Sequence, residues 1–138
     1  MCGSCLRAII LGLMLACLAS GIITAQSPTR GNPEGAKIKN AVAVTPESIA
    51  AGKTIFQRYC AACHGVDAKG GAPIGDVGPP PPNLSDERWD HGSSDGEIYY
   101  VIKQGVPPDF FMESWEDRIS NTDLWNIVNY IRSLAPPK

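Results

Sequence analysis

The feature that most constrains this chain of 138 residues is the segment Cys-Ala-Ala-Cys-His at positions 60–64. Two cysteines three positions apart, with a histidine directly after the second, are compatible with four kinds of site. These are a free thiol pair, a zinc site, a redox-active disulfide and the covalent attachment of a haem. On a helix, Cys60 and Cys63 lie one turn apart on the same face. The rest of the sequence has to decide among the four.

Helical patterns lie on both sides of this segment, and no convincing strand or internal repeat is present. The first helix is expected over 46–62, where Thr45 is placed to cap it and a proline occupies its first position. A second helix of about three turns is expected after a capping box formed by Ser94 and Glu97, and it stops at Gly105. The pattern therefore predicts short helices only.

The last helix is expected to start after Ser120 and to end before Pro136. One face of it carries an apolar stripe, formed by Leu124, Ile127, Val128, Ile131 and Leu134. Gly52 in the first helix would allow a close approach to an aromatic residue of the last helix, such as Trp125 or Tyr130. We therefore expect the first and last helices to pack on each other.

The segment 66–92 between the first two helices is too rich in glycine and proline for a helix or a sheet. Four successive prolines favour an extended backbone, so we expect a long wrapping loop. Three short helices and long loops leave little core of their own, and a flat apolar group such as a haem would fill the gap. Cys60 and Cys63 would then form thioethers with one edge of the porphyrin, and His64 would lie beneath the iron.

The competing sites fit the same residues less well. A structural zinc site needs four ligands, and the available set is Cys60, Cys63, His64 and the distant His91. Adjacent ligands at a helix end suit tetrahedral coordination poorly. A thioredoxin-like dithiol would open a helix within an α/β unit, whereas this pair ends a helix and no strands are predicted.

The N-terminus reads as a secretory leader. Cys2, Cys5 and Cys17 all lie in or beside an apolar run over 8–25, which Arg7 precedes and small residues follow. Cleavage after residue 25 is the first expectation, and a retained membrane anchor is the main alternative, because the run approaches the ~20 apolar residues of a membrane span. Lipid attachment at Cys17 is a weaker third possibility.

Each of these alternatives sends the rest of the chain across a membrane. We therefore predict a signal peptide or membrane anchor over 1–25, a flexible linker over 26–44 and a single domain over 45–138. The net charge of −2 becomes −3 if Arg7 is lost with the leader, which provides no basic footprint for nucleic acid. The cleaved chain would keep a single methionine, Met112.

From about residue 45 to 134 the chain resembles the class I monohaem cytochromes c. The resemblance extends especially to exported bacterial members and to the haem domains associated with terminal oxidases and dehydrogenases. The matching segments, in the order of the family, are YCAACHG, PNLSDERWDHG, GEIYYVIKQGVP, FFMESW and NIVNYIRSL. The resemblance implies an all-α cytochrome c fold, in which about three to five short helices and long loops wrap around one covalently bound haem c.

The resemblance also implies a role for particular residues. Cys60 and Cys63 would be the thioether attachments, His64 the proximal axial ligand of the iron and Met112 the distal one. The carbonyl of Pro82 would accept a hydrogen bond from Nδ1 of His64. Trp89 and Trp115 are further candidates, since their indole N–H groups could reach the haem propionates, with plain packing as the alternative for both.

The chain departs from the family pattern at two positions. Glu113 follows Met112 where proline is usual, and His91 stands where tyrosine is common, which introduces a rival axial ligand. We favour Met112 as the ligand, because Phe110, Phe111 and Trp115 flank it and would surround its thioether with an apolar, water-poor shell. Methionine is an established haem ligand, whereas His91 lies in a polar stretch.

Two axial ligands leave no open position on the iron, so we predict electron transfer and no catalysis. The expected protein is a periplasmic or membrane-tethered carrier in a bacterial respiratory chain, at the periplasmic face of the inner membrane if it is anchored. The alternative is a fixed electron-transfer subunit of a dehydrogenase or oxidase complex, and a weaker one is a catalytic or sensing haem protein. Its partners would be redox proteins, and it would be a monomer or a subunit of a complex.

Overall fold

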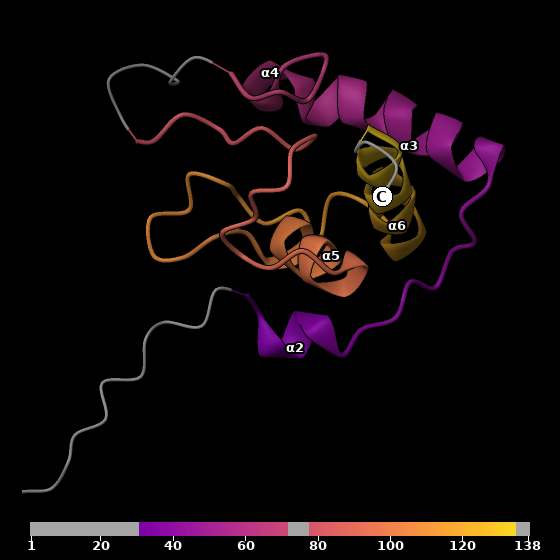
Figure 1. The fold of residues 1–138 in the computed structure, drawn as a ribbon, viewed down its shortest axis with the longest axis horizontal. Coiled ribbons are helices and arrows are strands. Elements are labelled where there is room, and N and C mark those ends of the chain that lie inside the picture. The colour runs from indigo at the N-terminus through magenta and orange to yellow at the C-terminus, as the bar shows by residue number, and fades with distance from the viewer. Residues whose placement is uncertain (1–30, 72–77, 135–138) are drawn as a thin grey trace, which may run out of the picture.

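The computed structural model describes residues 31–71 and 78–134. Within these residues the fold contains helices and no strand, which confirms the predicted all-α class. The helices, shown in Figure 1, are α2 (Pro33–Ala36), α3 (Pro46–Tyr59), α4 (Ala61–His64), α5 (Asp95–Gln104) and α6 (Asn121–Leu134).

The predicted leader over 1–25 and the first part of the predicted linker, 26–30, lie outside the described residues. Among the helices that the structure describes, none combines the length and the apolar character needed to cross a bilayer. The choice between a cleaved leader and a retained anchor therefore stays a prediction.

The starts of the three longer helices follow the predicted caps. Thr45 Oγ1 accepts a hydrogen bond from the backbone N–H of Ser48 at 3.2 Å, and the Ser48 hydroxyl returns one by accepting from Thr45 N at 3.1 Å. Ser94 and Glu97 form the same reciprocal pair at the start of α5. The Ser120 hydroxyl accepts from a backbone N–H of α6 at 3.1 Å. These contacts satisfy donors that a helix start leaves without partners.

The first predicted helix is divided in two near its end. α3 ends at Tyr59, three residues before the predicted boundary, and α4 begins after Cys60. The backbone N–H of Cys60 still donates to Phe56 O at 2.8 Å, so the helix breaks only after this residue. Cys60 consequently stands at the junction of the two helices, and Cys63 and His64 lie on the separate turn α4.

α3 crosses α6 at a point of direct backbone contact (Figure 1). A Cβ atom placed on Gly52 would lie 1.8 Å from the carbonyl oxygen of Asn126. The prediction of an aromatic neighbour for Gly52 is therefore wrong at this position, because the two backbones leave no room for a ring. Tyr130 packs instead on Phe56, with ring centroids 5.3 Å apart. The core lies along this crossing, where Phe56, Leu124, Ile127 and Val128 are fully buried.

α5 packs on the other side of α6. The Tyr99 ring stacks on the Trp125 ring, with centroids 4.1 Å apart and an interplanar angle of 13°. The Tyr99 hydroxyl donates to Asn121 Oδ1 at 2.7 Å, which satisfies the polar end of this largely buried ring. Together the two contacts fix α5 against the start of α6.

Residues 31–44, which fall within the linker expected over 26–44, pack against α5 and α6. A Cβ atom on Gly96 would lie 2.2 Å from Gly35 O, so these two glycines allow α2 and α5 to touch through their backbones. Asn32 N donates to Glu97 Oε1 at 3.0 Å. Glycine residues in this segment therefore permit close packing as well as flexibility.

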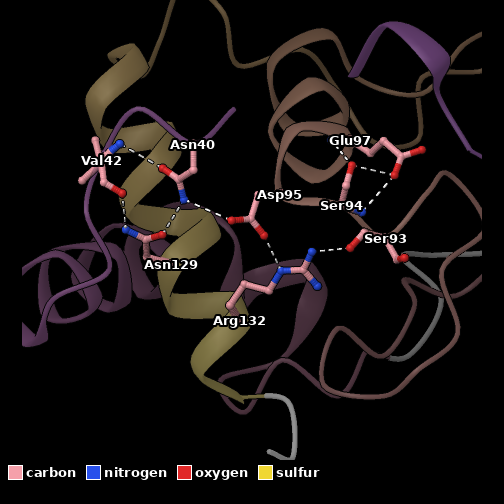
Figure 2. Close-up of polar contacts among 8 residues, drawn as sticks. All are labelled: Asn40, Val42, Ser93, Ser94, Asp95, Glu97, Asn129 and Arg132. Carbon is pink, nitrogen blue, oxygen red and sulfur yellow. Dashed lines mark hydrogen bonds and ion pairs between the residues drawn. The ribbon is translucent and has the colours of Figure 1, made fainter. Parts of the chain in front are cut away.

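A polar network ties the same segment to α5 and α6 (Figure 2). Asn129 of α6 is fully buried; its Nδ2 donates to Val42 O, and its Oδ1 accepts from Asn40 Nδ2 at 2.8 Å. Arg132 Nε donates to Asp95 Oδ1 at 2.7 Å, which links α6 to the first residue of α5. Long-range hydrogen bonds of this kind hold the residues before α3 in one position.

Candidate haem-attachment site

The site is built around α4, a single helical turn that contains Cys63 and His64 and that Cys60 directly precedes. The carbonyl oxygen of Cys60 accepts from the backbone N–H groups of Cys63 at 3.1 Å and of His64 at 2.9 Å. Gly65, at φ +78°, adopts a backbone conformation that favours glycine and ends the turn. Both thiols are free and half-buried. They are thus available for attachment on one short, well-defined turn.

The loop after α4 folds back over the turn. Gly70 N donates to His64 O at 3.0 Å, and Leu84 N donates to Ala68 O at 2.7 Å. Gly70 is at φ +92°, and a Cβ atom on it would lie 2.5 Å from Pro81 O. Only glycine therefore allows the chain after His64 to approach the proline-rich segment so closely, and the approach places that segment beside the histidine.

The imidazole of His64 is the most unusual polar group of the site. Burial lowers the pKa of His64, and the backbone carbonyl of Pro82 opposes this shift with a smaller effect. Within the described residues, Nδ1 of His64 is the one buried side-chain nitrogen or oxygen that has no hydrogen-bond partner. The Pro82 carbonyl is thus near the ring but makes no hydrogen bond to it, and the predicted bond to Nδ1 stays a prediction.

An unpartnered buried polar atom costs about 1–3 kcal/mol, so the polypeptide alone leaves the His64 ring incompletely satisfied. A haem iron that binds one ring nitrogen fixes the proton on the other, which then needs an acceptor. The Pro82 carbonyl, which is close enough to affect the pKa of His64, is the candidate acceptor. The buried Nδ1 of this half-buried ring and the nearby carbonyl therefore fit a histidine that binds haem iron.

The cysteines do not resemble a redox or metal-binding pair. Burial raises the pKa of the Cys60 thiol to about 11, and the neighbouring Cys63 acts in the same direction. A reactive dithiol needs a lowered pKa, so these surroundings disfavour a redox-active pair. In the described part of the chain, no three His, Cys, Asp or Glu side chains are grouped to hold a metal ion. His91, the fourth ligand considered for zinc, is exposed.

Met112 lies in the loop between α5 and α6, half-buried against the core. Its carbonyl accepts from Val106 N at 2.9 Å, and Gly105, at φ +74°, brings the backbone within contact of the same carbonyl. These two contacts fix the loop without the proline that the family usually has after the methionine. Figure 1 shows this loop and the loop after α4 extending to the same side of the helices.

The two phenylalanines before Met112 do not cover it as the sequence suggested. Phe110 is 48% exposed and Phe111 is 55% exposed, so neither ring is buried around the thioether. Phe111 lies against Gly78, where a Cβ atom would approach its ring to 2.6 Å. The apolar shell expected around Met112 is therefore incomplete in the polypeptide by itself.

Trp89 and Trp115 are both half-buried and pack against the core. Trp115 lies between the Tyr59 ring, with centroids 5.6 Å apart, and the Arg118 guanidinium, 4.0 Å above its own ring. The Arg132 guanidinium lies 5.9 Å from the Trp89 ring. These contacts explain both residues as packing groups, and their hydrogen bonds to propionates stay predictions.

Sequence reasoning missed two residues that shape the site. Gly70 allows the loop to cross Pro81, and Gln57 Nε2 donates to Val66 O at 2.8 Å, which ties the loop back to α3. The Gly-Gly pair at 70–71 was a visible signal for the first of these. The second depends on the three-dimensional path of the loop and left no signal in the sequence.

Comparison with known proteins places these features in a family. Residues 47–131 match the family model described as cytochrome c oxidase, cbb3-type, subunit III. The cbb3-type cytochrome c oxidase subunit FixP of Bradyrhizobium sp. (strain ORS 278) is 36% identical over 89 residues, which are 64% of this chain and 28% of that protein. The subunit CcoP of Rubrivivax gelatinosus is 31% identical over 99 residues, 69% of this chain and 29% of that protein. The chain thus spans less than a third of the length of either relative.

Two solved structures share the fold. One belongs to the Kuenenia stuttgartiensis reducing HAO-like protein complex Kustc0457/Kustc0458, with a TM-score of 0.61 and 25% identity over 72% of this chain and 50% of that one. The other is cytochrome CL of Methylophaga aminisulfidivorans, with a TM-score of 0.52 and 22% identity over 76% of this chain and 61% of that one. The second likeness shows the fold alone.

Proposed function

Because the chain belongs to the family of cytochrome c oxidase, cbb3-type, subunit III, we propose that it carries one haem c and passes electrons within an oxidase complex. This proposal follows the alternative considered for the sequence, a fixed electron-transfer subunit, in preference to a free carrier. The names of the relatives support that order, since FixP and CcoP are described as subunits of cbb3-type cytochrome c oxidase.

The observation that carries the proposal is the arrangement of α4. Cys60 and Cys63 present two unpaired thiols on one turn, and His64 follows them with a half-buried ring whose buried Nδ1 lacks a partner. The thiols would attach the edge of the haem, and the imidazole would bind its iron from one side. When bound, haem c supplies an iron that accepts and releases one electron.

Met112 is proposed as the second axial ligand. It is half-buried on a loop whose backbone Gly105 and Val106 fix, and it lies in the family segment FFMESW. A soft thioether ligand favours the reduced iron, so the potential should exceed that of a haem bound by two histidines in similar surroundings. With both axial positions filled, a substrate has no place to bind, and the chain is proposed to be an electron-transfer subunit and not itself an enzyme.

The export signal of the sequence supports a periplasmic place for the domain. A retained run over 8–25 would tether it to the inner membrane, as suits a subunit of a membrane oxidase. N-terminal sequencing of the native protein distinguishes a cleaved chain from a tethered one. Purification in mild detergent distinguishes a subunit from a free carrier, because only a subunit stays with other oxidase chains.

Attachment of the haem is tested by intact mass and by haem staining of the denatured protein on a gel. We expect the native chain to weigh one haem more than its polypeptide, whereas the variant with both Cys60→Ala and Cys63→Ala gains no such mass. Ala62→Ser, at an exposed position between them, is the matched control and should keep the haem. Extraction of the native pigment into acid acetone would show that the haem is not covalently held.

A further inference from the structure

A pocket of about 240 Å³ lies beside the candidate site and is not part of it. It forms where the C-terminal half of α3 meets the turn before α6, and residues 54–59 and 118–123 contribute its walls. Ile55 and the buried Ile119 provide apolar lining. Two arginines, Arg58 and Arg118, line the same pocket. A small cavity with an apolar part and two guanidinium groups suits a ligand that is short and anionic.

Arg118 is held in position by its surroundings. Its Nη2 donates to Glu113 Oε2 at 2.8 Å and to Ser114 O at 2.6 Å, and its guanidinium lies 4.0 Å above the Trp115 ring. A guanidinium has five N–H groups, and both of these hydrogen bonds come from Nη2. Three N–H groups are therefore left for a ligand, on a side chain that is already fixed.

Arg58 and Tyr59 are the less restrained members of the pocket. Within the described residues Arg58 forms no ion pair, and its guanidinium lies 5.1 Å from the Tyr59 ring. Tyr59 is 38% exposed, and its ring is steadied by Trp115. The guanidinium and the phenol both donate hydrogen bonds, so each is able to meet an acceptor in the pocket.

Asp123 is the one acidic residue among those that line the pocket. Its carboxylate already accepts from the Ser120 hydroxyl at 2.8 Å and from Asn126 Nδ2 at 3.4 Å. It also lies in the first turn of α6, where the positive end of the helix dipole favours a negative charge. These hydrogen bonds leave the negative charge of Asp123 in place, so the lining residues carry two positive charges and one negative charge, and this balance favours an anion.

We propose that this pocket receives a carboxylate side chain, Asp or Glu, from the protein that exchanges electrons with this chain. A carboxylate matches the planar fork of an arginine through two parallel hydrogen bonds. The volume favours a side chain over a free ligand, because pockets for drug-sized molecules usually measure about 300–1,000 Å³. The proposal rests on the proposed electron-transfer function.

The position of the pocket would bring a bound partner protein close to the haem. Tyr59 directly precedes Cys60, and the Trp115 ring that it touches lies three residues after Met112. A partner whose carboxylate enters here therefore sits next to both segments that would hold the haem. The whole chain carries a net charge of −2, so the attraction is local and its effect should fall with added salt.

The test is an NMR titration of the haem-loaded, reduced protein with a blocked tripeptide, acetyl-Gly-Glu-Gly-amide. We expect saturable shifts of the backbone amides of 118–123, and an affinity about fivefold lower in Arg58→Gln. Arg58 is the safest position to change, because it makes no ion pair within the described residues. Lys37→Gln, at the residue directly after α2, removes the same charge outside the pocket lining and should leave the affinity unchanged.

A second variant and a second probe make the result specific. Arg118→Lys keeps the charge but loses the planar fork, so it should also weaken the peptide. The tripeptide with glutamine in place of glutamate should produce no saturable shift. Equal shifts with both peptides, or an equal affinity in Arg58→Gln and Lys37→Gln, would overturn the proposal. If acetate binds more tightly than the glutamate peptide, the pocket is a site for small carboxylates, and the proposal is likewise overturned.

The same samples separate this inference from the proposed function. If the protein holds no haem or cannot be reduced and reoxidised, the electron-transfer function itself fails. If the protein holds haem and is reduced and reoxidised normally, but the glutamate peptide does not shift the backbone amides of 118–123, only the docking proposal is wrong. The midpoint potential of Arg58→Gln should equal that of the wild type in either case, since the arginine is placed at a partner contact.

Discussion

The two ends of α3 lie in contrasting surroundings. Around its first half the protein is tightly packed. Gly52 contacts the backbone of α6, and both polar atoms of the buried Asn129 side chain form hydrogen bonds. Beyond its last residue the packing within the protein is incomplete. His64 Nδ1 lacks a partner there, both thiols are unpaired, and Phe110 and Phe111 stay half-exposed.

This contrast distinguishes a region whose side chains are satisfied by the protein from a region whose side chains need a bound group. The α3 and α6 crossing is a protein core in the ordinary sense, dense and with its polar groups satisfied. The region of α4 and its two loops has an ordered backbone, but several of its side chains have no protein partner. A haem held by Cys60 and Cys63 would provide those partners, so the stability of the second region should depend on it.

Preventing attachment of the haem should have the largest effect on the stability of the protein. We expect the variant with both Cys60→Ala and Cys63→Ala to lack the cooperative thermal transition of the loaded protein, because a small domain has only about 5–15 kcal/mol of stability to lose. Circular dichroism melts of the two proteins measure this. A transition of the variant at the same midpoint would mean that the region of α4 and its two loops is stable without an attached haem.

Gly52→Ala should have the next largest effect, and it acts on the closed region. Its new Cβ would lie 1.8 Å from Asn126 O, so α3 and α6 must move apart. We expect the free energy of unfolding of the loaded protein to fall by about 3 kcal/mol, measured with denaturant. The neighbouring exposed Lys53→Ala is the control and should change it by less than about 0.5 kcal/mol. Similar values for both variants would contradict the close crossing.

Asn129→Ala tests the polar part of the same region. The change removes the donor to Val42 O and Ser48 Oγ and leaves buried groups without partners. We expect a loss of about 2 kcal/mol in the free energy of unfolding. Thr122→Ala, at an exposed position on α6, should be nearly neutral. An equally small effect at Asn129 would show that residues 40–44 do not depend on the network.

Glu97→Gln should have the smallest effect and a distinct pH dependence. Hydrogen bonds from Ser94, and with a smaller effect from Asn32 and Ser93, lower the pKa of Glu97 below its usual 4.5. A carboxyl with a lowered pKa stabilises the fold above pH 4.5, and this contribution is lost as the pH falls through its folded pKa.

The wild type should therefore exceed Glu97→Gln in stability at neutral pH by about 1 kcal/mol, and the two should converge in acid. Thermal melts from pH 7 to pH 3 follow the difference. A constant difference across this range would assign the effect of Glu97 to packing and not to its charge.

The sequence allowed the helices to be predicted because their starts depend on neighbouring residues. The capping pairs Thr45 with Ser48 and Ser94 with Glu97 act over three positions, so the pattern contains all that is needed. The arrangement of Cys60, Cys63 and His64 on one turn is equally local. Fold class and attachment motif could therefore be recognised without coordinates.

What could not be predicted depends on contacts between distant residues. The packing of residues 31–44 depends on pairs such as Asn40 with Asn129, 89 positions apart, which no local pattern reveals. Gly52 was recognised as a contact point, but its neighbour is the backbone of Asn126 and not a ring. The exposure of Phe110 and Phe111 likewise depends on how the loop folds, and composition alone suggested the opposite.

The most direct test of the proposed site is the absorption spectrum of the loaded protein in both redox states, compared among the wild type, Met112→Ala and His91→Ala. Ligation by His64 and Met112 predicts a low-spin ferric haem with a weak near-infrared band from methionine to iron and no binding of carbon monoxide. Met112→Ala should lose the band, lower the potential and admit carbon monoxide, while His91→Ala should behave as the wild type. A normal low-spin spectrum in Met112→Ala together with a high-spin one in His91→Ala would contradict this ligation and assign the distal position to His91.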